Sequence, residues 1–269
     1  MEELTLTEIN IYPIKSLGGI SLKTGVIGDR GIQHDRRWML VDKENTFITQ
    51  RKWAQLALLK VALHEDHLEV FNKDHGSLKV GLNETTKIES KVTVWESTCS
   101  ALEVSKDANN YFSSYLNTSI RLVYMPDSNL RYVDKNYANN NEIVGFADAF
   151  PLLLIGEGSL NDLNAKLENP IPMNRFRPNL VVNTSVPFDE DNWIEFSIGC
   201  ANFKAAKPCS RCIMPTIDQN TGIKSSEPLK TLSSYRNFNN KIMFGQNLLF
   251  LGGDRNLNLN NRLIVKSRK

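Results

Sequence analysis

Two cysteines separated by two residues, Cys209 and Cys212, form the part of this sequence best suited to chemistry. Arg211 stands between them, and a neighbouring cation favours the thiolate, the form of cysteine that binds a metal or attacks an electrophile. Apolar, strand-like runs flank the motif on both sides. The pair alone is compatible with several kinds of site.

Three common sites built on two such cysteines fit the sequence poorly. A structural zinc site needs four Cys or His ligands close together, and neither Cys99, Cys200 nor the four histidines have ligand-like spacing near residue 209. The order of the cysteines does not match a plant-type iron–sulfur cluster. A thioredoxin-like dithiol would begin a helix, whereas residues 213–218 indicate a strand and a turn. Two alternatives remain open: cysteines without a chemical task, and one thiolate on a soft metal whose other ligands come from a cofactor.

Composition indicates a globular protein without a strongly charged partner. The 269 residues, enough for one large or two medium domains, include 32 basic and 30 acidic residues, a net charge of +2. This balance gives no global field that would attract nucleic acid or a membrane. The chain starts with acidic and polar residues and has no long apolar run, so we expect neither a signal peptide nor a transmembrane segment. Four cysteines fit a reducing compartment, and we expect a cytoplasmic protein with free thiols.

The first half of the chain is predicted to consist of short strands. Alternating or apolar segments recur about every 8–12 residues, which is typical of an antiparallel barrel or curled sheet. The expected strands cover residues 6–12, 22–27, 38–41, 47–49, 57–63, 67–71, 78–81 and 91–94. Aromatic residues and Leu116 at helical spacing predict a helix over residues 107–116. Residues 126–142 are polar and rich in asparagine, which indicates a surface loop or a domain junction.

The second half adds strands and one helix. Residues 152–155 are continuously apolar, as in a buried strand, and leucines at helical spacing predict a helix over residues 157–167 with Ser159 as its N-cap. Further strands are expected over residues 179–183, 193–198, 201–206, 213–217, 248–251 and 263–265. The predicted fold class is mainly β with some α (α+β), arranged as two barrel-like modules.

Several basic residues lie in turns or at strand ends, where they could hold an anion. Lys15 and Ser16 occupy a turn that contains proline and glycine, and both side chains can donate to a phosphate. Arg175 and Arg177 precede a strand and suit a bidentate phosphate contact. A solvated surface position explains each of them equally well. The full set is Lys15, Arg36, Arg37, Arg51, Arg175, Arg177 and Arg211.

The order of these motifs resembles the MOSC-domain proteins, in particular bacterial relatives of the mitochondrial amidoxime reducing component. The resemblance runs nearly end to end. It is carried by residues 11–16, 35–41, 48–51, 146–151, 174–179, 209–212 and 218–222, and residues 227–236 are also similar to the family. It implies an N-terminal MOSC β-barrel-like domain over residues 1–125 and a C-terminal MOSC β-barrel domain over residues 126–269.

The resemblance also implies a molybdenum cofactor, a molybdopterin with its metal, in the cleft between the domains. Cys212 would be the thiolate ligand to molybdenum, which is expected chemistry for a soft metal. Cys212 and Asp148 are the implied catalytic residues, with Asp148 as a proton relay. The residues implied around the pterin and its phosphate are Lys15, Ser16, Arg36, Asp148, Ala149, Phe150, Arg177, Ser210 and Arg211.

The activity implied is an oxidoreductase that reduces N-hydroxylated substrates, such as hydroxylamines, amidoximes or N-hydroxylated bases, to amines or amidines. One alternative is a carrier of the molybdenum cofactor or of sulfur, with a persulfide on Cys209 or Cys212 and no reductase activity. Another is a structural dithiol or zinc protein. Pyridoxal phosphate binding is a further family-level expectation.

Electrons are expected from an external donor, a ferredoxin, a flavodoxin or a cytochrome b5-like protein with its reductase. The chain has no iron–sulfur spacing and no Gly-x-Gly-x-x-Gly after a predicted strand, so NADH has no evident binding site. Small-molecule substrates are expected, without nucleic acid or membrane partners.

Two departures from the family pattern affect the expected substrate wall. The mitochondrial proteins have Phe-Gly-Gln-Tyr where this chain ends the same motif in Asn247, and Thr-Ser where it has Ala149 and Phe150. Hydroxyl donors are therefore missing at three positions, and the wall around the substrate must differ.

Overall fold

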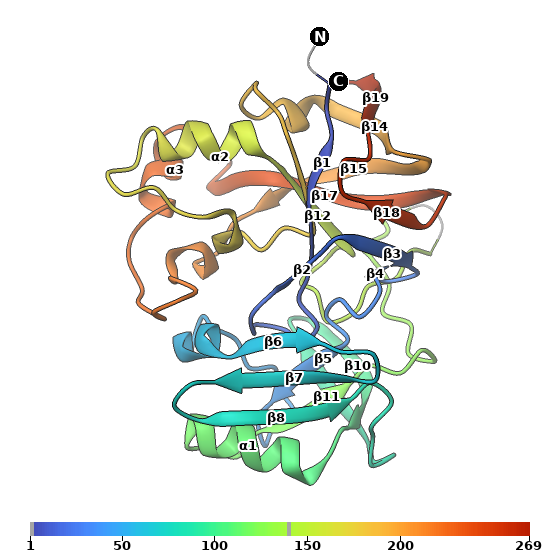
Figure 1. Ribbon diagram of the computed structural model, residues 1–269, viewed down its shortest axis with the longest axis vertical. Helices are drawn as coiled ribbons and strands as arrows, with labels where there is room; N and C mark the ends of the chain where they lie inside the picture. The colour runs from blue at the N-terminus through green and yellow to red at the C-terminus, as the bar shows by residue number, and fades with distance from the viewer. Residues whose placement is uncertain (1–2, 139–140) are drawn as a thin grey trace.

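The structure is a computed structural model that describes residues 3–138 and 141–269. In Figure 1 the strands gather in a larger upper half and a smaller lower half. The chain starts in the larger half, builds the smaller half from β5 (Trp38–Val41) to β11 (Arg121–Tyr124), and then returns. The predicted class, mainly β with some α, is confirmed. Within the described residues, no helix combines the length and apolar character needed to cross a membrane.

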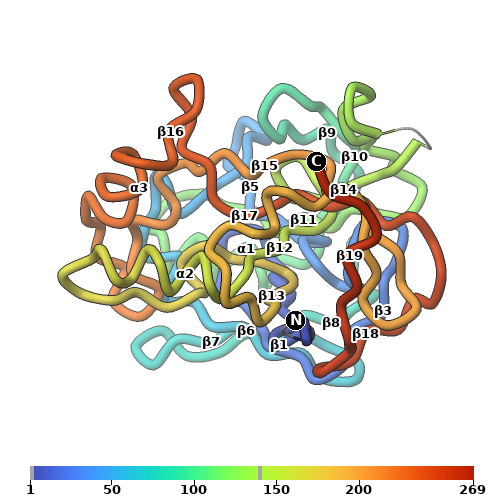
Figure 2. The backbone as a smooth tube through the Cα atoms, turned by 90° about the horizontal axis from the view of Figure 1, so that it is seen from above, coloured from blue at the N-terminus to red at the C-terminus, as the bar shows by residue number. Residues whose placement is uncertain are grey.

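One large sheet organises the upper half. Its nine strands are β1 (Leu6–Ile11), β2 (Ile20–Leu22), β12 (Leu152–Gly156), β13 (Leu180–Val182), β14 (Trp193–Ile198), β15 (Ala201–Ser210), β16 (Asn237–Phe238), β17 (Lys241–Gly253) and β19 (Leu263–Arg268). The spatial order is β19-β14-β15-β17-β12-β13-β1-β2, with β16 paired to β17. Strands β12 and β13 are parallel, and β1 runs antiparallel to both β13 and β2. Figure 2 shows β1 and β13 side by side, so the first strand of the chain completes a sheet made mostly by the second half.

Three smaller sheets complete the β structure of the residues that the structure describes. In the lower half, β9 (Glu89–Val94) and β10 (Ser97–Glu103) join β5 and β11, while β6 (Lys60–Leu63), β7 (His67–Asn72) and β8 (Gly76–Gly81) form a separate meander. The third sheet contains β3 (Thr24–Gly28), β4 (Gly31–Ile32) and β18 (Asn256–Asn258). Buried side chains on Trp38, Leu68 and Phe112 form one core around the lower sheets, and those on Ile9, Phe196 and Phe203 form another around the large sheet.

Helix α1 (Lys106–Leu116) follows directly from its sequence. The Ser105 hydroxyl caps it by accepting a hydrogen bond from the Ala108 amide at 3.3 Å. Ala108, Phe112 and Leu116 are four residues apart and buried, so one face of the helix packs against the lower core. The helix ends at Asn117 in the left-handed conformation (φ 48°), a common C-terminal stop. The predicted helix over residues 107–116 is thereby confirmed.

The other helices are short, and two predictions about them and their neighbours are wrong. They are α2 (Glu157–Asn164), α3 (Leu229–Tyr235) and the 3₁₀ turns η1 (Ala54–Leu58), η2 (Met173–Arg175), η3 (Asp189–Asn192) and η4 (Met214–Thr216). Ser159 is not the N-cap of α2, because the helix already begins after Gly156 and the Ser159 hydroxyl donates to Glu190 at 2.7 Å. The strand predicted over residues 213–217 is instead the turn η4, since Pro215 fixes φ and has no amide hydrogen for a ladder.

Other differences are local. Residues 47–49 form a single bridge from Phe47 to Val41 rather than a strand, and the strand predicted from residue 57 begins only at Lys60, after η1. Strands β10 and β11 were not predicted. The polar loop predicted over residues 126–142 contains neither a helix nor a named strand in its described part, and residues 139–140 lie outside the description. A domain boundary at residue 125 stays a prediction.

Candidate functional site

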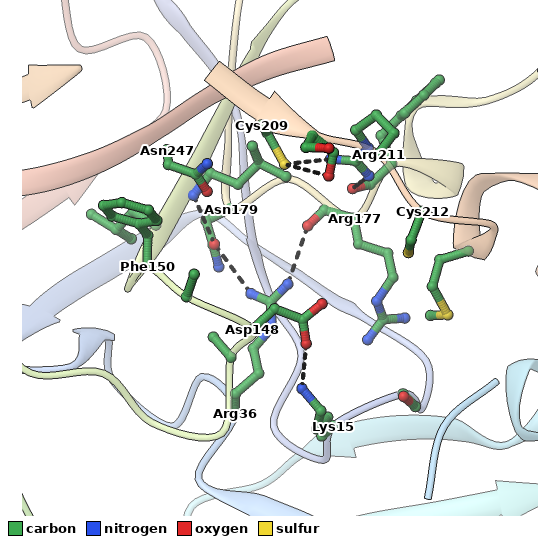
Figure 3. Close-up of a pocket in the computed structure, with 18 of the residues that line it drawn as sticks. Lys15, Arg36, Asp148, Phe150, Arg177, Asn179, Cys209, Arg211, Cys212 and Asn247 are labelled. Carbon is green, nitrogen blue, oxygen red and sulfur yellow. Dashed lines mark hydrogen bonds and ion pairs between the residues drawn. The ribbon is translucent and has the colours of Figure 1, made fainter. Parts of the chain in front are cut away.

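A single pocket collects the sequence-predicted site residues from segments that lie far apart in the chain. Lys15, Ser16, Arg36, Asp148, Ala149, Phe150, Arg177, Ser210, Arg211 and Cys212 all line it. Figure 3 shows many of these side chains directed toward a common space. Residues that lie as much as 197 positions apart in the sequence, Lys15 and Cys212, therefore share one cavity wall. Their roles in binding stay predictions.

Several lining residues lie outside the predicted set of cofactor-binding and catalytic residues, although Arg51, Cys209 and Asn247 were named as candidates for other roles. They are Arg51, Ala147, Leu152, Leu153, Phe176, Asn179, Cys209, Met214 and Asn247. Asn247 takes the place of the tyrosine in the family motif, and it lines the pocket as that motif predicted it would. A positive residue inside a matching motif was the only sequence signal for Arg51.

The two cysteines of the motif have different surroundings. Cys209 lies on β15 and Cys212 just beyond its end, where the pairing of β15 with β17 becomes irregular. The Cys209 Sγ accepts a hydrogen bond from Arg211 Nη1 at 3.1 Å, whereas the Cys212 Sγ accepts one from Arg51 Nε at 3.3 Å. Figure 3 shows the two sulfur atoms apart, with Arg211 beside Cys209. Each thiol is half-buried and free, and each has its own guanidinium partner.

No group of three or more Cys, His, Asp or Glu side chains in the described residues is arranged to hold a metal ion. The Cys212 thiolate could serve as one ligand to a metal. Soft metals accept such a thiolate readily.

Asp148 is the centre of a charged cluster at one side of the pocket. Its Oδ1 accepts from Lys15 Nζ at 2.6 Å and from the Trp95 indole at 3.0 Å, and its Oδ2 accepts from Arg51 Nη2 at 2.9 Å. Burial alone would raise the pKa of Asp148, but the Lys15 and Arg51 charges outweigh it and hold the pKa far below its usual range. Burial also lowers the pKa of Lys15, against the effect of Asp148. The carboxylate is thus an ionised acceptor at neutral pH.

The loop that carries Asp148 is fixed by a buried arginine that sequence reasoning missed. Arg131 donates to the carbonyl oxygens of Gly145, Ala147 and Asp148 at 2.8, 2.6 and 3.0 Å. Three charge-assisted hydrogen bonds to carbonyls within residues 145–148 define the path of this loop. Nothing in the asparagine-rich segment around residue 131 indicated this role.

Tyr12 organises two further arginines. The guanidinium carbons of Arg36 and Arg177 lie 4.3 and 4.1 Å from the Tyr12 ring centroid, as in cation–π contacts. Both arginines have a left-handed backbone, with φ 47° and 57°. Arg36 also pairs with buried Asp35 at 2.7 Å, and Arg177 donates to the Leu17 carbonyl at 2.6 Å. Burial lowers the pKa of Arg177 to about 10, a value at which it stays charged near neutral pH.

The pocket carries an excess of positive charge that suits an anionic ligand. Five cations line it, and two carboxylates pair with them, which leaves three positive charges in excess (5 − 2 = 3). The Arg211 Nε is in addition buried without a hydrogen-bond partner. An unpaired buried donor is costly, so it marks a position where a ligand acceptor would be stabilised. The cations are Lys15, Arg36, Arg51, Arg177 and Arg211, and the carboxylates are Asp35 and Asp148.

The sequence matches two domain families in chain order. Residues 3–119 match the MOSC N-terminal beta barrel domain and residues 141–259 match the MOSC domain. The chain therefore belongs to the family of MOSC-domain proteins that includes the mitochondrial amidoxime reducing components, as the resemblance indicated.

Individual relatives come from two groups. The chain is 33% identical over 246 residues to mitochondrial amidoxime reducing component 2 of Rattus norvegicus, covering 86% of this chain and 72% of that protein. It is 31% identical over 243 residues to mitochondrial amidoxime-reducing component 1 of Mus musculus, covering 86% and 71%. It is also 31% identical over 266 residues to the molybdenum cofactor sulfurase of Oryza sativa subsp. japonica. That match covers 91% of this chain but only 32% of the sulfurase, so the chain spans about a third of the longer protein.

Proposed function

We propose that this chain binds a molybdenum cofactor and reduces N-hydroxylated compounds, such as hydroxylamines, amidoximes or N-hydroxylated bases, to amines or amidines. The observation that carries the proposal is the half-buried free thiol of Cys212 in a pocket with three excess positive charges. A thiolate offers one soft ligand, and the cations suit a phosphate-bearing organic group. The similarity to proteins named for amidoxime reduction supports the substrate class.

The chain's own residues would divide the binding between them. Lys15, Arg36 and Arg177 would hold the phosphate and the pterin from the side of β1, with Ser16 as a further donor. Ser210 and Arg211, at the end of β15, would contact the cofactor from the side of that strand. The loop with Ala149 and Phe150 would line the wall of the pocket. Cys212 would supply the thiolate to the metal.

When bound, the cofactor would supply the two-electron chemistry that cleaves an N–O bond, with uptake of two protons and release of water. Asp148 would hold Lys15 and Arg51 in place around the cofactor, because the Asp148 carboxylate accepts hydrogen bonds from both. Its depressed pKa makes it a poor proton donor at neutral pH. A relay of protons by Asp148 stays a prediction, and it would require this carboxylate to gain a proton despite its low pKa. The Asp148 side chain is half exposed, so water could deliver that proton.

A carrier function is the second candidate, and the similarity to the cofactor sulfurase is what favours it. In that case Cys209 or Cys212 would hold a persulfide, and no substrate would be reduced. The Arg211 guanidinium next to Cys209 would stabilise the negative charge of such a group. Pyridoxal phosphate binding, expected from the family resemblance, and a cytoplasmic location, expected from the composition, also stay predictions.

The decisive experiment combines metal analysis with turnover. Protein purified from a host that makes the cofactor should contain molybdenum and, with reduced viologen as electron donor, should reduce benzamidoxime to benzamidine. NADH alone should give no turnover, and a ferredoxin, flavodoxin or cytochrome b5-like donor with its reductase should restore it. Molybdenum-loaded protein that carries persulfide but reduces no hydroxylamine or amidoxime would favour the carrier. Zinc-loaded protein without molybdenum would exclude both.

A further inference from the structure

Arg51 is carried by a turn that the structure fixes from both sides. The Thr49 carbonyl accepts hydrogen bonds from the amides of Lys52 at 3.1 Å and Trp53 at 2.9 Å, which closes the turn. The preceding side chain, Gln50, is fully buried and donates to the Ser16 carbonyl at 2.7 Å. Gln50 thereby ties this turn to the Lys15–Ser16 turn of the pocket. The backbone of Arg51 is consequently held in place by groups that do not touch its side chain.

The Gln50 amide also pairs with Gln219, a residue of the loop that follows the cysteine motif. Gln219 Nε2 donates to Gln50 Oε1 at 3.1 Å, and Gln50 Nε2 lies 3.3 Å from Gln219 Oε1. On the outer side, Lys224 Nζ donates to the Arg51 carbonyl at 2.8 Å. The turn is thus linked at two points, Gln219 and Lys224, to the segment downstream of Cys212.

The Arg51 guanidinium uses separate nitrogen atoms for two partners. Its Nε donates to the Cys212 Sγ at 3.3 Å, while its Nη2 donates to Asp148 Oδ2 at 2.9 Å. Its planar group also lies over the Trp95 ring, 4.5 Å from the centroid. Only a guanidinium presents donors in a rigid fork of this kind, whereas a lysine ammonium offers one point charge. The arrangement therefore requires arginine rather than any cation.

Trp95 comes from the tip of the β9–β10 hairpin and serves as a support for Arg51. Its backbone is left-handed (φ 56°), an uncommon conformation for a tryptophan. The indole donates to Asp148 Oδ1 at 3.0 Å, and the ring packs against Phe47 with centroids 5.0 Å apart. One face of the Arg51 guanidinium is thereby covered by a side chain that also holds its carboxylate partner.

We propose that Arg51 is a positioning residue for the Cys212 sulfur, supported by Asp148 and Trp95, and that its Nε–H tunes the metal that Cys212 would bind. The inference rests on the proposed function. A hydrogen bond to a ligating sulfur withdraws electron density from it and fixes its orientation, so that such contacts tune metal centres. The positive charge next to the sulfur also favours the electron-rich, reduced state of the metal.

The test measures the metal rather than turnover alone. Wild type, Arg51→Gln, Arg51→Lys and the control Arg121→Gln are loaded with cofactor, and the reduction potential and the paramagnetic resonance spectrum of the half-reduced metal are recorded. Arg121 is a matched control, because it is a partly buried arginine ion-paired to Glu103 and is absent from the lining of the pocket. Arg51→Gln should lower the potential and shift the spectrum. Arg51→Lys should shift both in the same direction by a smaller amount, and Arg121→Gln should shift neither.

The outcomes separate failure of cofactor binding by the chain from failure of the role assigned to Arg51. Wild-type protein without molybdenum would contradict the proposed function itself. Molybdenum-containing wild type together with an unchanged spectrum and potential in the Arg51 variants would overturn the role of Arg51 alone. Loss of molybdenum from both Arg51 variants would make Arg51 a residue for cofactor retention, and would overturn the positioning role as well.

Discussion

The Lys15 ammonium and the Asp148 carboxylate form a 2.6 Å ion pair that joins the turn after β1 to the loop before β12. Lys15 also donates to the Phe146 carbonyl at 2.7 Å, so its three-donor head is anchored twice to the same loop. Its side chain is nearly buried while that of Asp148 is half exposed. The Lys15 ammonium is thus a fixed positive group in the pocket wall, and the Asp148 carboxylate that balances its charge is partly open to solvent.

Removing single cations from the pocket should lower cofactor retention. We expect Lys15→Ala, Arg36→Ala and Arg177→Ala each to reduce molybdenum occupancy, since a charge-assisted hydrogen bond contributes about 1.5–3 kcal/mol, roughly ten- to a hundredfold in affinity. Elemental analysis of purified protein measures this directly. Lys43→Ala, at a side chain that is 76% exposed, is the control and should leave occupancy unchanged. Full occupancy in all three variants would show that these cations do not hold the cofactor.

The two cysteines of the motif should differ sharply. Cys212→Ser should abolish both molybdenum binding and N-reductive turnover, because a serine hydroxyl is a poor substitute for a soft thiolate. Cys209→Ser should have a much smaller effect, because the Cys209 sulfur is already engaged by Arg211. Metal content and benzamidoxime reduction are measured for both variants. The assignment fails if Cys209→Ser is inactive and Cys212→Ser is tolerated.

Glu190 should make stability depend on pH. Burial raises the pKa of this carboxyl group, whose Oε1 accepts from the Gly156 amide and the Ser159 hydroxyl while its Oε2 has no partner. A raised folded-state pKa means that stability is complete below the unfolded value of about 4.3 and declines as the pH rises above it.

Glu190→Gln, which keeps the shape but cannot ionise, should remove that decline. We expect the variant to gain free energy of unfolding relative to wild type between pH 4 and pH 8, by at most about 1.4 kcal/mol per pH unit. Urea unfolding at several pH values measures the difference. Glu44→Gln, at an exposed carboxylate, is the control, and its difference in unfolding free energy from wild type should not change with pH. A difference between Glu190→Gln and wild type that does not change with pH would contradict the raised pKa of the buried carboxyl group.

Gly245 should tolerate no side chain. Its φ is 82°, and an added Cβ would lie 2.8 Å from the Leu154 carbonyl oxygen and 2.7 Å from an Ile155 side-chain carbon. Gly252 on the same strand also has a positive φ, of 112°, but has open space around it. Alanine at either position adds backbone strain of about 1–3 kcal/mol, and at Gly245 overpacking adds roughly another 1–3 kcal/mol. Denaturant unfolding should therefore rank Gly245→Ala below Gly252→Ala in stability, and equal values would contradict the packing around β17.

Local apolar patterns predicted helices and strands well where no other effect opposed them. The apolar run at residues 152–155 became β12, and the helical spacing over residues 107–116 became α1, because in both cases the apolar pattern matches the buried face. Residues 213–217 looked equally strand-like, but one proline overrode the apolar pattern. Helix α3 was missed since it is only seven residues long and contains two serines.

Individual site residues could be predicted only where they belong to a sequence motif of the family. Lys15 and Arg177 lie in recognisable motifs, and both line the pocket. The contact of Arg51 with Cys212 spans 161 positions, and no periodicity encodes such a contact. The same holds for Arg131 and Trp95, whose roles depend on the tertiary path of a loop and on the tip of a hairpin.

The pairing of β1 with β13 has a consequence for the order in which the chain folds. Thr7 on β1 and Val181 beside it on β13 are 174 positions apart, and Figure 2 shows their strands side by side. Contacts of such long range slow folding, because loop closure must precede them. During synthesis the first strand emerges long before its partner exists, whereas β5 to β11 are complete by residue 124. We therefore expect the intervening half to acquire protection from hydrogen exchange first, and the pocket to form last.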